Sequence, residues 1–107
     1  MDKKDFFTPP KHIHFSAKKL FDKCGEIMNG SVAYLEPDGG GPTELHTHEY
    51  DHLFIVIKGE AKVVFDNKIH IIRENESFLV KGSIPHSVWN NIRDTTIMVG
   101  ISVNRQK

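Results

Sequence analysis

The sequence predicts an all-β fold, an antiparallel sandwich or barrel of about eight short strands. Short apolar or β-branched segments recur along the chain, and turn residues separate them at intervals of about 8–12 residues. No sustained helical periodicity follows Gly25. With 107 residues, the chain has the length of one domain with one modest core. We therefore treat residues 1–107 as a single domain.

The first third of the chain gives the least regular pattern. Residues 1–15 are polar and carry Pro9-Pro10, which predicts an arm or an edge strand. Residues 17–24 are compatible with two helical turns, in which Leu20 and Phe21 are the only large apolar side chains. A short strand is expected at residues 32–35, and the cluster Pro-Asp-Gly-Gly-Gly-Pro at residues 37–42 should end it.

The remaining two thirds read as strands joined by turns. Lys58-Gly59 ends one apolar segment, and Asp66-Asn67 is a pair suited to a two-residue hairpin turn. The strands predicted here cover residues 53–57, 61–65, 68–72, 77–80, 86–90 and 95–103.

Composition excludes several classes of partner. Lys plus Arg and Asp plus Glu both number 14, so no basic excess indicates nucleic acid or an anionic membrane surface. The longest apolar run, residues 53–57, is too short for a membrane span, and the start of the chain lacks the apolar core of an export signal. The single cysteine, Cys24, excludes an internal disulfide and fits a reducing compartment. We expect a cytoplasmic protein.

Three of the seven histidines fall within residues 46–52. In a strand, His46 and His48 project from the same face, and two imidazoles on one face are a common start of a metal site. His52 opens the next apolar strand, from which its ring could turn back to the same ion. A His-x-His pair also occurs as a plain polar edge pair. The pair follows a glycine-rich loop and precedes a strand that looks buried, and this position favours the metal site.

This region resembles the first motif of the cupins: Gly40, five residues, His46-x-His48, three residues, His52, six residues, Gly59. Glu normally stands at the place of His52. Residues 75–90 resemble the second cupin motif, with His86 in the histidine place, Pro85 before it, and Asn90 in the asparagine place. The departures from that second motif are Asn75 for the first Gly, Lys81 for Pro, Ser83 for the second Gly, and Gly82 one residue early.

The resemblance implies a jelly-roll or double-stranded β-helix with motifs at residues 40–59 and 75–90. It implies one divalent transition-metal ion, Mn or Fe being favoured over Ni, Co or Zn, with His46, His48, His52 and His86 as ligands. Four neutral histidines leave the ion's full positive charge uncompensated, which favours an anionic oxygen ligand.

Two functions fit this reading. One is a metal-dependent oxygenase or isomerase/lyase acting on a small oxygen-rich metabolite, and the other is a non-enzymatic domain that binds or senses a sugar or effector. Phe54, Val56 and Tyr34 are expected to line the pocket. No catalytic acid or base is assigned, although the mouth of the pocket could be reached by Glu44, Tyr34, Glu49 and Tyr50.

Other residues are given structural roles. Trp89 is expected to pack or to lie in an interface, and His12, His14 and His70 to be solvated or hydrogen-bonded. Cys24 has no nearby partner that would make it a nucleophile. The segment with Phe6, Phe7, Ile13 and Phe15 has no obvious place inside so small a barrel, and we expect a two-fold homodimer that buries part of it.

Overall fold

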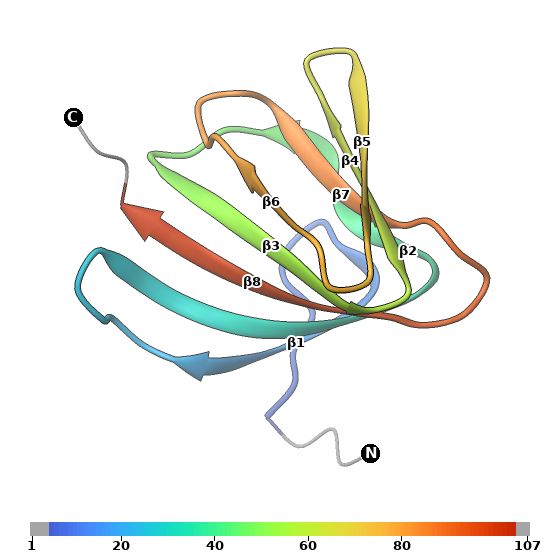
Figure 1. The fold of residues 1–107 in the computed structure, drawn as a ribbon, viewed down its shortest axis with the longest axis horizontal. Helices are drawn as coiled ribbons and strands as arrows, with labels where there is room; N and C mark the ends of the chain where they lie inside the picture. Colours follow the sequence, from blue (N-terminus) through green and yellow to red (C-terminus); the bar gives the residue numbers. More distant parts are fainter. Residues whose placement is uncertain (1–4, 105–107) are drawn as a thin grey trace.

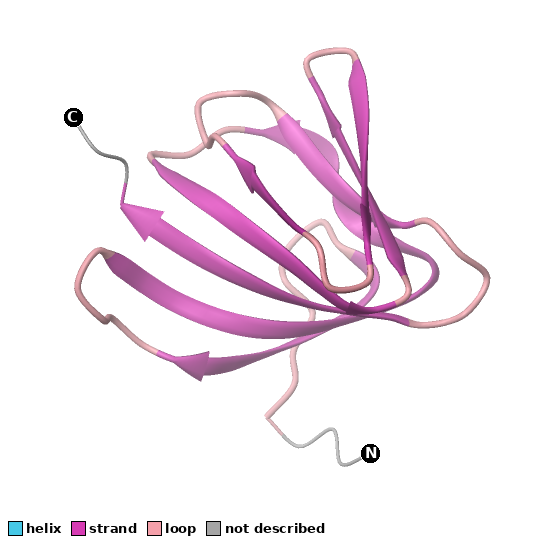
Figure 2. Cartoon of the chain, in the orientation of Figure 1, coloured by secondary structure: helices cyan, strands magenta, loops and turns pink. Residues whose placement is uncertain are grey.

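The computed structural model describes residues 5–104, which form eight antiparallel strands and no helix (Figure 2). The strands pair in the order β5-β4-β7-β2-β8-β3-β6, with β1 added on β2, and the sheet curls into a nearly closed barrel (Figure 1). The all-β prediction is confirmed. The bounds are β1 (Ile13–Phe21), β2 (Ile27–His46), β3 (Tyr50–Lys58), β4 (Glu60–Phe65), β5 (Lys68–Arg73), β6 (Ser77–Val80), β7 (His86–Asn90) and β8 (Thr96–Asn104).

The first half of the chain differs from its prediction. Residues 17–24 do not form a helix, because β1 pairs with β2 and buries alternate residues such as Phe15 and Ala17. Tertiary pairing thus overrides the local preference. The expected stop at residues 37–42 was also wrong, since β2 continues through the whole cluster to His46.

The bend in β2 decides where the histidines lie. Before the bend, β2 pairs with β8 and β1, and after it, Gly40 and Gly41 pair with Trp89 and Val88 of β7. A Cβ atom on Gly40 would meet the carbonyl oxygen of Val88, and the φ of Gly40 is +151°. Glycine therefore lets one strand approach β7 closely and carry His46 to it.

Two turns were predicted correctly from their residue types. The β4–β5 hairpin turns at Asp66 and Asn67, whose φ angles are +48° and +58°, as a type I′ turn requires. Asn75, which stands at a glycine place of the second motif, adopts a φ of +64°. Asparagine tolerates this left-handed conformation, so the substitution leaves the turn in place.

The core lies inside the barrel and takes alternate residues of its strands. Phe15 is 8% exposed and belongs to this core, so this residue of the N-terminal segment has a place within the single chain, whereas Ile13 remains exposed. Phe7 forms an isolated bridge with Ala17 and remains exposed. No helix among the described residues is long and apolar enough to cross a membrane. The buried apolar side chains are Phe15, Ala17, Ala33, Leu35, Phe54, Val56, Ala61, Val63, Ile72, Val80, Val88 and Met98.

Candidate metal centre

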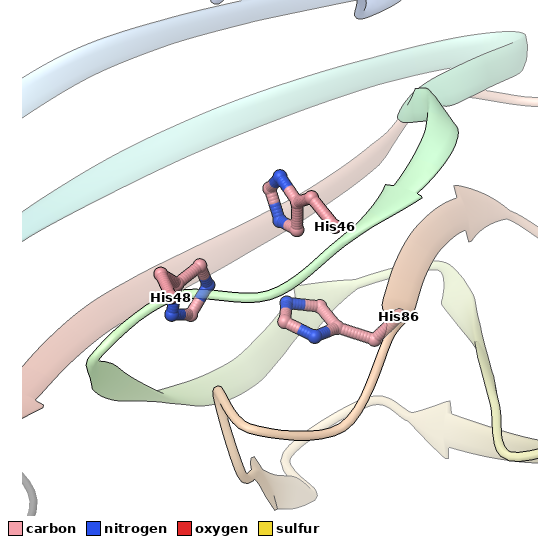
Figure 3. Close-up of side chains that lie close together, drawn as sticks. All are labelled: His46, His48 and His86. Carbon is pink, nitrogen blue, oxygen red and sulfur yellow. The ribbon is translucent and has the colours of Figure 1, made fainter.

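Three histidines meet at one end of the barrel. His46 ends β2, His48 lies in the loop that follows, and His86 begins β7, directly opposite His46 in the β2–β7 pairing. One ligand nitrogen from each ring lies within 4.8 Å of the other two. Figure 3 shows the three rings converging from these two segments of the chain. The cluster can hold one metal ion.

Backbone carbonyls fix two of these rings and their tautomers. Nδ1 of His48 donates to the carbonyl oxygen of Tyr50 at 2.6 Å, and Nδ1 of His86 donates to that of Ile84 at 2.7 Å. Because a carbonyl oxygen only accepts, each Nδ1 carries the hydrogen and each Nε2 keeps its lone pair.

The buried Nε2 atoms fit a metal ion. Both are inaccessible to solvent, and Nε2 of His86 meets no hydrogen-bond partner among residues 5–104. A buried acceptor left without a partner costs free energy, and a divalent ion accepting the lone pair removes that cost. Nδ1 bonded to a carbonyl is also the usual orientation of a metal-binding histidine.

Gly82 brings the two motifs together. The backbone N–H of His48 donates to the carbonyl oxygen of Gly82 at 2.9 Å, and the N–H of Gly82 donates to Oδ1 of Asp51 at 2.9 Å. A Cβ atom on Gly82 would meet the carbonyl oxygen of Tyr50 and would lie 2.5 Å from Nδ1 of His48. The displaced glycine of the second motif is therefore the residue that lets the loop before His86 lie against His48.

His52 lies beside the cluster but outside the group of three. Its ring centroid is 4.6 Å from that of His48 and 6.0 Å from that of His86. The ring stacks on Phe54, and Nδ1 lies 3.5 Å from Oγ of Ser102. The nitrogens that share one 4.8 Å group belong to His46, His48 and His86. The role of His52 as fourth ligand stays a prediction.

Burial keeps the imidazoles of His46, His52 and His86 neutral. Desolvation, followed by the neighbouring imidazoles, lowers the pKa of His52 to about 3. The same two causes, in the same order, lower the pKa of His46 to about 4. Burial also lowers the pKa of His86, against the opposing effect of its bond to Ile84. Neutral imidazole is the form that binds a metal.

A cavity of about 370 Å³ opens next to this cluster. Among the described residues that line it there is no carboxylate, lysine or arginine, and Tyr50 is the only one besides the histidines with a side-chain proton donor. The lining consists of Pro9, Pro10, His12, Phe15, Gly41, Pro42, His46, Tyr50, His52, Phe54, His86 and Val88.

Of the three residues expected to line the pocket, one does so in the structure and two do not. Phe54 lines the cavity, whereas Val56 is fully buried in the core. Tyr34 packs edge-on against Phe6, with ring centroids 5.6 Å apart, and is not among the lining residues. Of the four residues considered for the mouth, only Tyr50 lines the cavity, and its ring stacks on His48 at 4.1 Å.

The N-terminal part of the cavity wall, with His12 in it, escaped sequence reasoning. His12 was expected to be simply solvated or hydrogen-bonded, but its ring forms part of the cavity wall. Only the register of β1 on β2, which pairs Ile13 with Gly40, brings it there. No spacing in the sequence relates His12 to the histidines at residues 46–52.

Asn90 organises the turn beyond the site. Its Nδ2 donates to the carbonyl oxygens of Leu35 and Asp94 at 2.8 and 2.7 Å. Its Oδ1 accepts from the N–H of Ile92 and from Oγ1 of Thr96. The buried amide is thus fully used for structure, which leaves no role for it as a ligand.

Comparisons with known proteins identify the fold. The family model described as "Cupin domain" matches residues 32–103. The cupin domain of an XRE family transcriptional regulator from Enterobacter cloacae has a TM-score of 0.75 at 18% identity, covering 87% of this chain and 99% of that one. A predicted oxalate decarboxylase from Thermotoga maritima gives 0.74 at 12%, covering 85% and 81%.

A third solved structure, the polyketide cyclase RemF from Streptomyces resistomycificus, has a TM-score of 0.74 at 16% identity. It covers 98% of this chain and 78% of that chain. A search of curated proteins gives no match. The three similar structures carry different names on one architecture, so the likeness shows the fold and leaves the chemistry to the residues of the site.

Proposed function

The chain belongs to the cupin domain family, and from this premise we propose that it binds one divalent transition-metal ion and acts on a small oxygen-rich, anionic metabolite. His46, His48 and His86 hold the ion, with His52 as a fourth ligand. The observation that supports this most directly is the buried Nε2 of His86, which lies in the three-histidine cluster without a hydrogen-bond partner among residues 5–104. The absence of a thiolate disfavours a closed structural zinc site. From the resemblance to the cupins, Mn or Fe is favoured, with Ni, Co or Zn as alternatives.

The charge of the site selects the ligand. The imidazoles of His46 and His52 are neutral, and the described lining residues supply no carboxylate, so these residues do not neutralise a divalent ion. A carboxylate, enolate or hydroxy acid supplies that negative charge itself. When bound, the ion acts as a Lewis acid that polarises the ligand's oxygen.

The chain's own residues supply orientation and exclusion of water. Phe54, Val88 and the prolines of the wall give the cavity an apolar surface against which a ligand's carbon skeleton packs. Tyr50 lines the cavity, and its phenol is the proposed group that hydrogen-bonds a ligand oxygen or exchanges a proton with it. This supports an enzyme of oxygenase or isomerase/lyase type.

The second candidate is a binding or sensing domain without turnover. It is favoured by the similarity to the cupin domain of a transcriptional regulator, which extends over 99% of that domain. The absence of a carboxylate from the described lining is also compatible with binding alone, because few groups are left to move protons.

Metal content tests the proposal first. Untagged protein purified without added metal should contain about one ion per chain, and His86→Ala should lose it. His14→Asn serves as the matched control, because His14 is exposed, lies outside the cluster and has a φ of +48° that asparagine tolerates. Equal metal content in the wild type and in His86→Ala would contradict the site.

Turnover separates the two functions. Oxygen uptake and product analysis with a panel of small carboxylic acids and diketones should give a reaction with the metal-loaded protein. Saturable binding of such an acid without oxygen uptake or product would favour the sensing function.

A two-fold homodimer remains part of the proposal. Phe15 is in the core and cannot lie in an interface, but the outer face of the sheet carries Leu53 and Ile55 beside Leu79, Val99 and Ile101 of the paired strands. Burial of this face by a second copy would remove apolar surface from water. Light scattering at micromolar concentration should give about twice the chain mass of 12.2 kDa, and a mass near 12.2 kDa would contradict the dimer.

A further inference from the structure

The outer part of the cavity is built by a segment that lies before the family match. The match begins at residue 32, whereas Pro9, Pro10, His12 and Phe15 all line the cavity. We refer to these four residues as the outer wall. These four residues therefore lie outside the part of the chain that the family model matches.

The outer wall is fixed to the barrel at several points. Phe15 is anchored in the core, and its carbonyl oxygen accepts from Oγ1 of Thr8 at 2.9 Å. The N–H of Thr43 donates to the carbonyl oxygen of Lys11 at 2.9 Å. Backbone bonds on both sides of His12 therefore hold the wall in one position.

The imidazole of His12 is itself held in place. Nδ1 lies 2.9 Å from the carbonyl oxygen of Pro10, so Nδ1 carries the hydrogen and Nε2 is the atom left for another partner. The ring packs edge-on against Phe15 with centroids 4.7 Å apart. A Cβ atom on Gly41 would come within 2.9 Å of the ring's Cγ, so the missing side chain of Gly41 makes room for the imidazole.

We infer that His12 is a specificity-determining residue that accepts, through Nε2, a hydrogen bond from a hydroxyl group of the ligand. The inference rests on the proposed function, because the ligand's acidic end binds at the metal centre. Its body packs against the apolar lining, and its hydroxyl end reaches the outer wall. The ligand class is a small hydroxylated acid with an apolar body.

Two probes that differ only in one hydroxyl test this. Phenylpyruvate and 4-hydroxyphenylpyruvate have the same acidic end and the same apolar ring, and isothermal titration of the Co²⁺-loaded protein measures both affinities. The variants are His12→Ala and, as the matched control, His14→Asn. Titration of Co²⁺ into each metal-free protein is carried out first, so that metal binding is measured separately from ligand binding.

The wild type should bind the hydroxylated probe about fivefold to tenfold more tightly, the value of one neutral hydrogen bond. His12→Ala should abolish that preference while its affinities for Co²⁺ and for phenylpyruvate stay within about twofold, and His14→Asn should keep it. Equal binding of the two probes by the wild type, a preference that survives in His12→Ala, or no binding of either probe to Co²⁺-loaded protein would overturn the inference. Failure to bind Co²⁺ would instead overturn the proposed function.

Discussion

The two ends of the cavity are built in different ways. At the inner end, His48 and His86 are oriented by carbonyls two residues away, and Gly82 ties their loops together through backbone bonds. At the outer end, a segment from outside the family match is attached by the buried side chain of Phe15, by the Thr43–Lys11 backbone bond and by an exposed ion pair between Lys11 and Glu44. The inner end carries the histidines of the two cupin motifs, whereas the outer end is built by residues that lie before the family match.

This difference has a thermodynamic meaning. A metal site requires ligand nitrogens placed to within a fraction of an ångström, so its supports must lie close and act on the backbone. A wall that only selects among ligands tolerates weaker attachment. Substitutions that displace the loops of the inner end should therefore lower both stability and metal affinity, whereas substitution of His12 at the outer end should change ligand preference alone.

Gly82→Ala should have the largest effect. The added methyl group would meet the carbonyl oxygen of Tyr50 and Nδ1 of His48, so the loop must move away from His48. We expect a loss of about 2–3 kcal/mol of unfolding free energy in urea, together with about tenfold or more in metal affinity.

Gly25→Ala is the matched control for Gly82→Ala. Nothing lies within 4 Å of its Cβ position, and its φ of +58° costs about 1 kcal/mol for an alanine. It should lower stability modestly and leave metal affinity unchanged. Equal metal affinity in Gly82→Ala and the wild type would contradict the prediction, because it would show that the loop can move away from His48 without disturbing the metal site.

Acidification should lower the free energy of unfolding of the metal-free protein. The pKa of His52 is lowered to about 3 in the fold, against about 6.5 for an exposed histidine. Between these two values the unfolded chain binds the proton and the folded chain does not, so stability falls as the pH falls from about 6.5 towards 3. Each such histidine contributes a slope of up to about 1.4 kcal/mol per pH unit.

Urea unfolding of the metal-free protein at several pH values between 7 and 4.5 measures this slope. His52→Gln should flatten it, because an amide does not titrate. A slope that is the same in His52→Gln and the wild type would assign the acid sensitivity to other groups.

The charge of the inner end can be changed by one unit with His52→Glu. A carboxylate restores the ligand that the first cupin motif normally has and lowers the positive charge of the loaded site. The variant should keep the metal and bind a small dicarboxylate about tenfold more weakly, measured by calorimetry of the metal-loaded proteins. Equal dicarboxylate affinities would remove the electrostatic argument for an anionic ligand.

The sequence was informative about the inner end because its signals are local. The two motifs identified the three clustered histidines, although His48 lies in the loop after β2 and not on one strand with His46 as expected. Asp66-Asn67 specifies its own turn. The outer end depends on the register between β1 and β2, which no local pattern contains. For the same reason, the strand from Ile13 to Phe21 was mistaken for helical turns.

The bend in β2 shows a second limit of sequence reasoning. The cluster at residues 37–42 was interpreted as a turn that ends the strand, because glycine and proline usually break pairing. In the structure they shape a strand that remains paired while it passes from β8 and β1 to β7. Only the partner strands distinguish a turn from such a bend.

The smallest effect is expected for Lys11→Ala at the outer end. The Lys11 ammonium lies 2.7 Å from the Glu44 carboxylate, but both side chains are largely exposed, and such pairs add little to stability. The bond from Thr43 to Lys11 uses the backbone and survives the substitution. Urea unfolding, metal affinity and the preference between the two phenylpyruvates should therefore all stay within error of the wild type.

The one expected change is at Glu44, because Lys11, first by its hydrogen bond and then by its charge, holds the pKa of that carboxyl below its usual value. In Lys11→Ala this pKa should rise, which an NMR titration of the Glu44 side chain measures. A large loss of ligand preference in Lys11→Ala would mean that the outer wall depends on its ion pair, and the two ends would then differ less than their backbone bonds indicate.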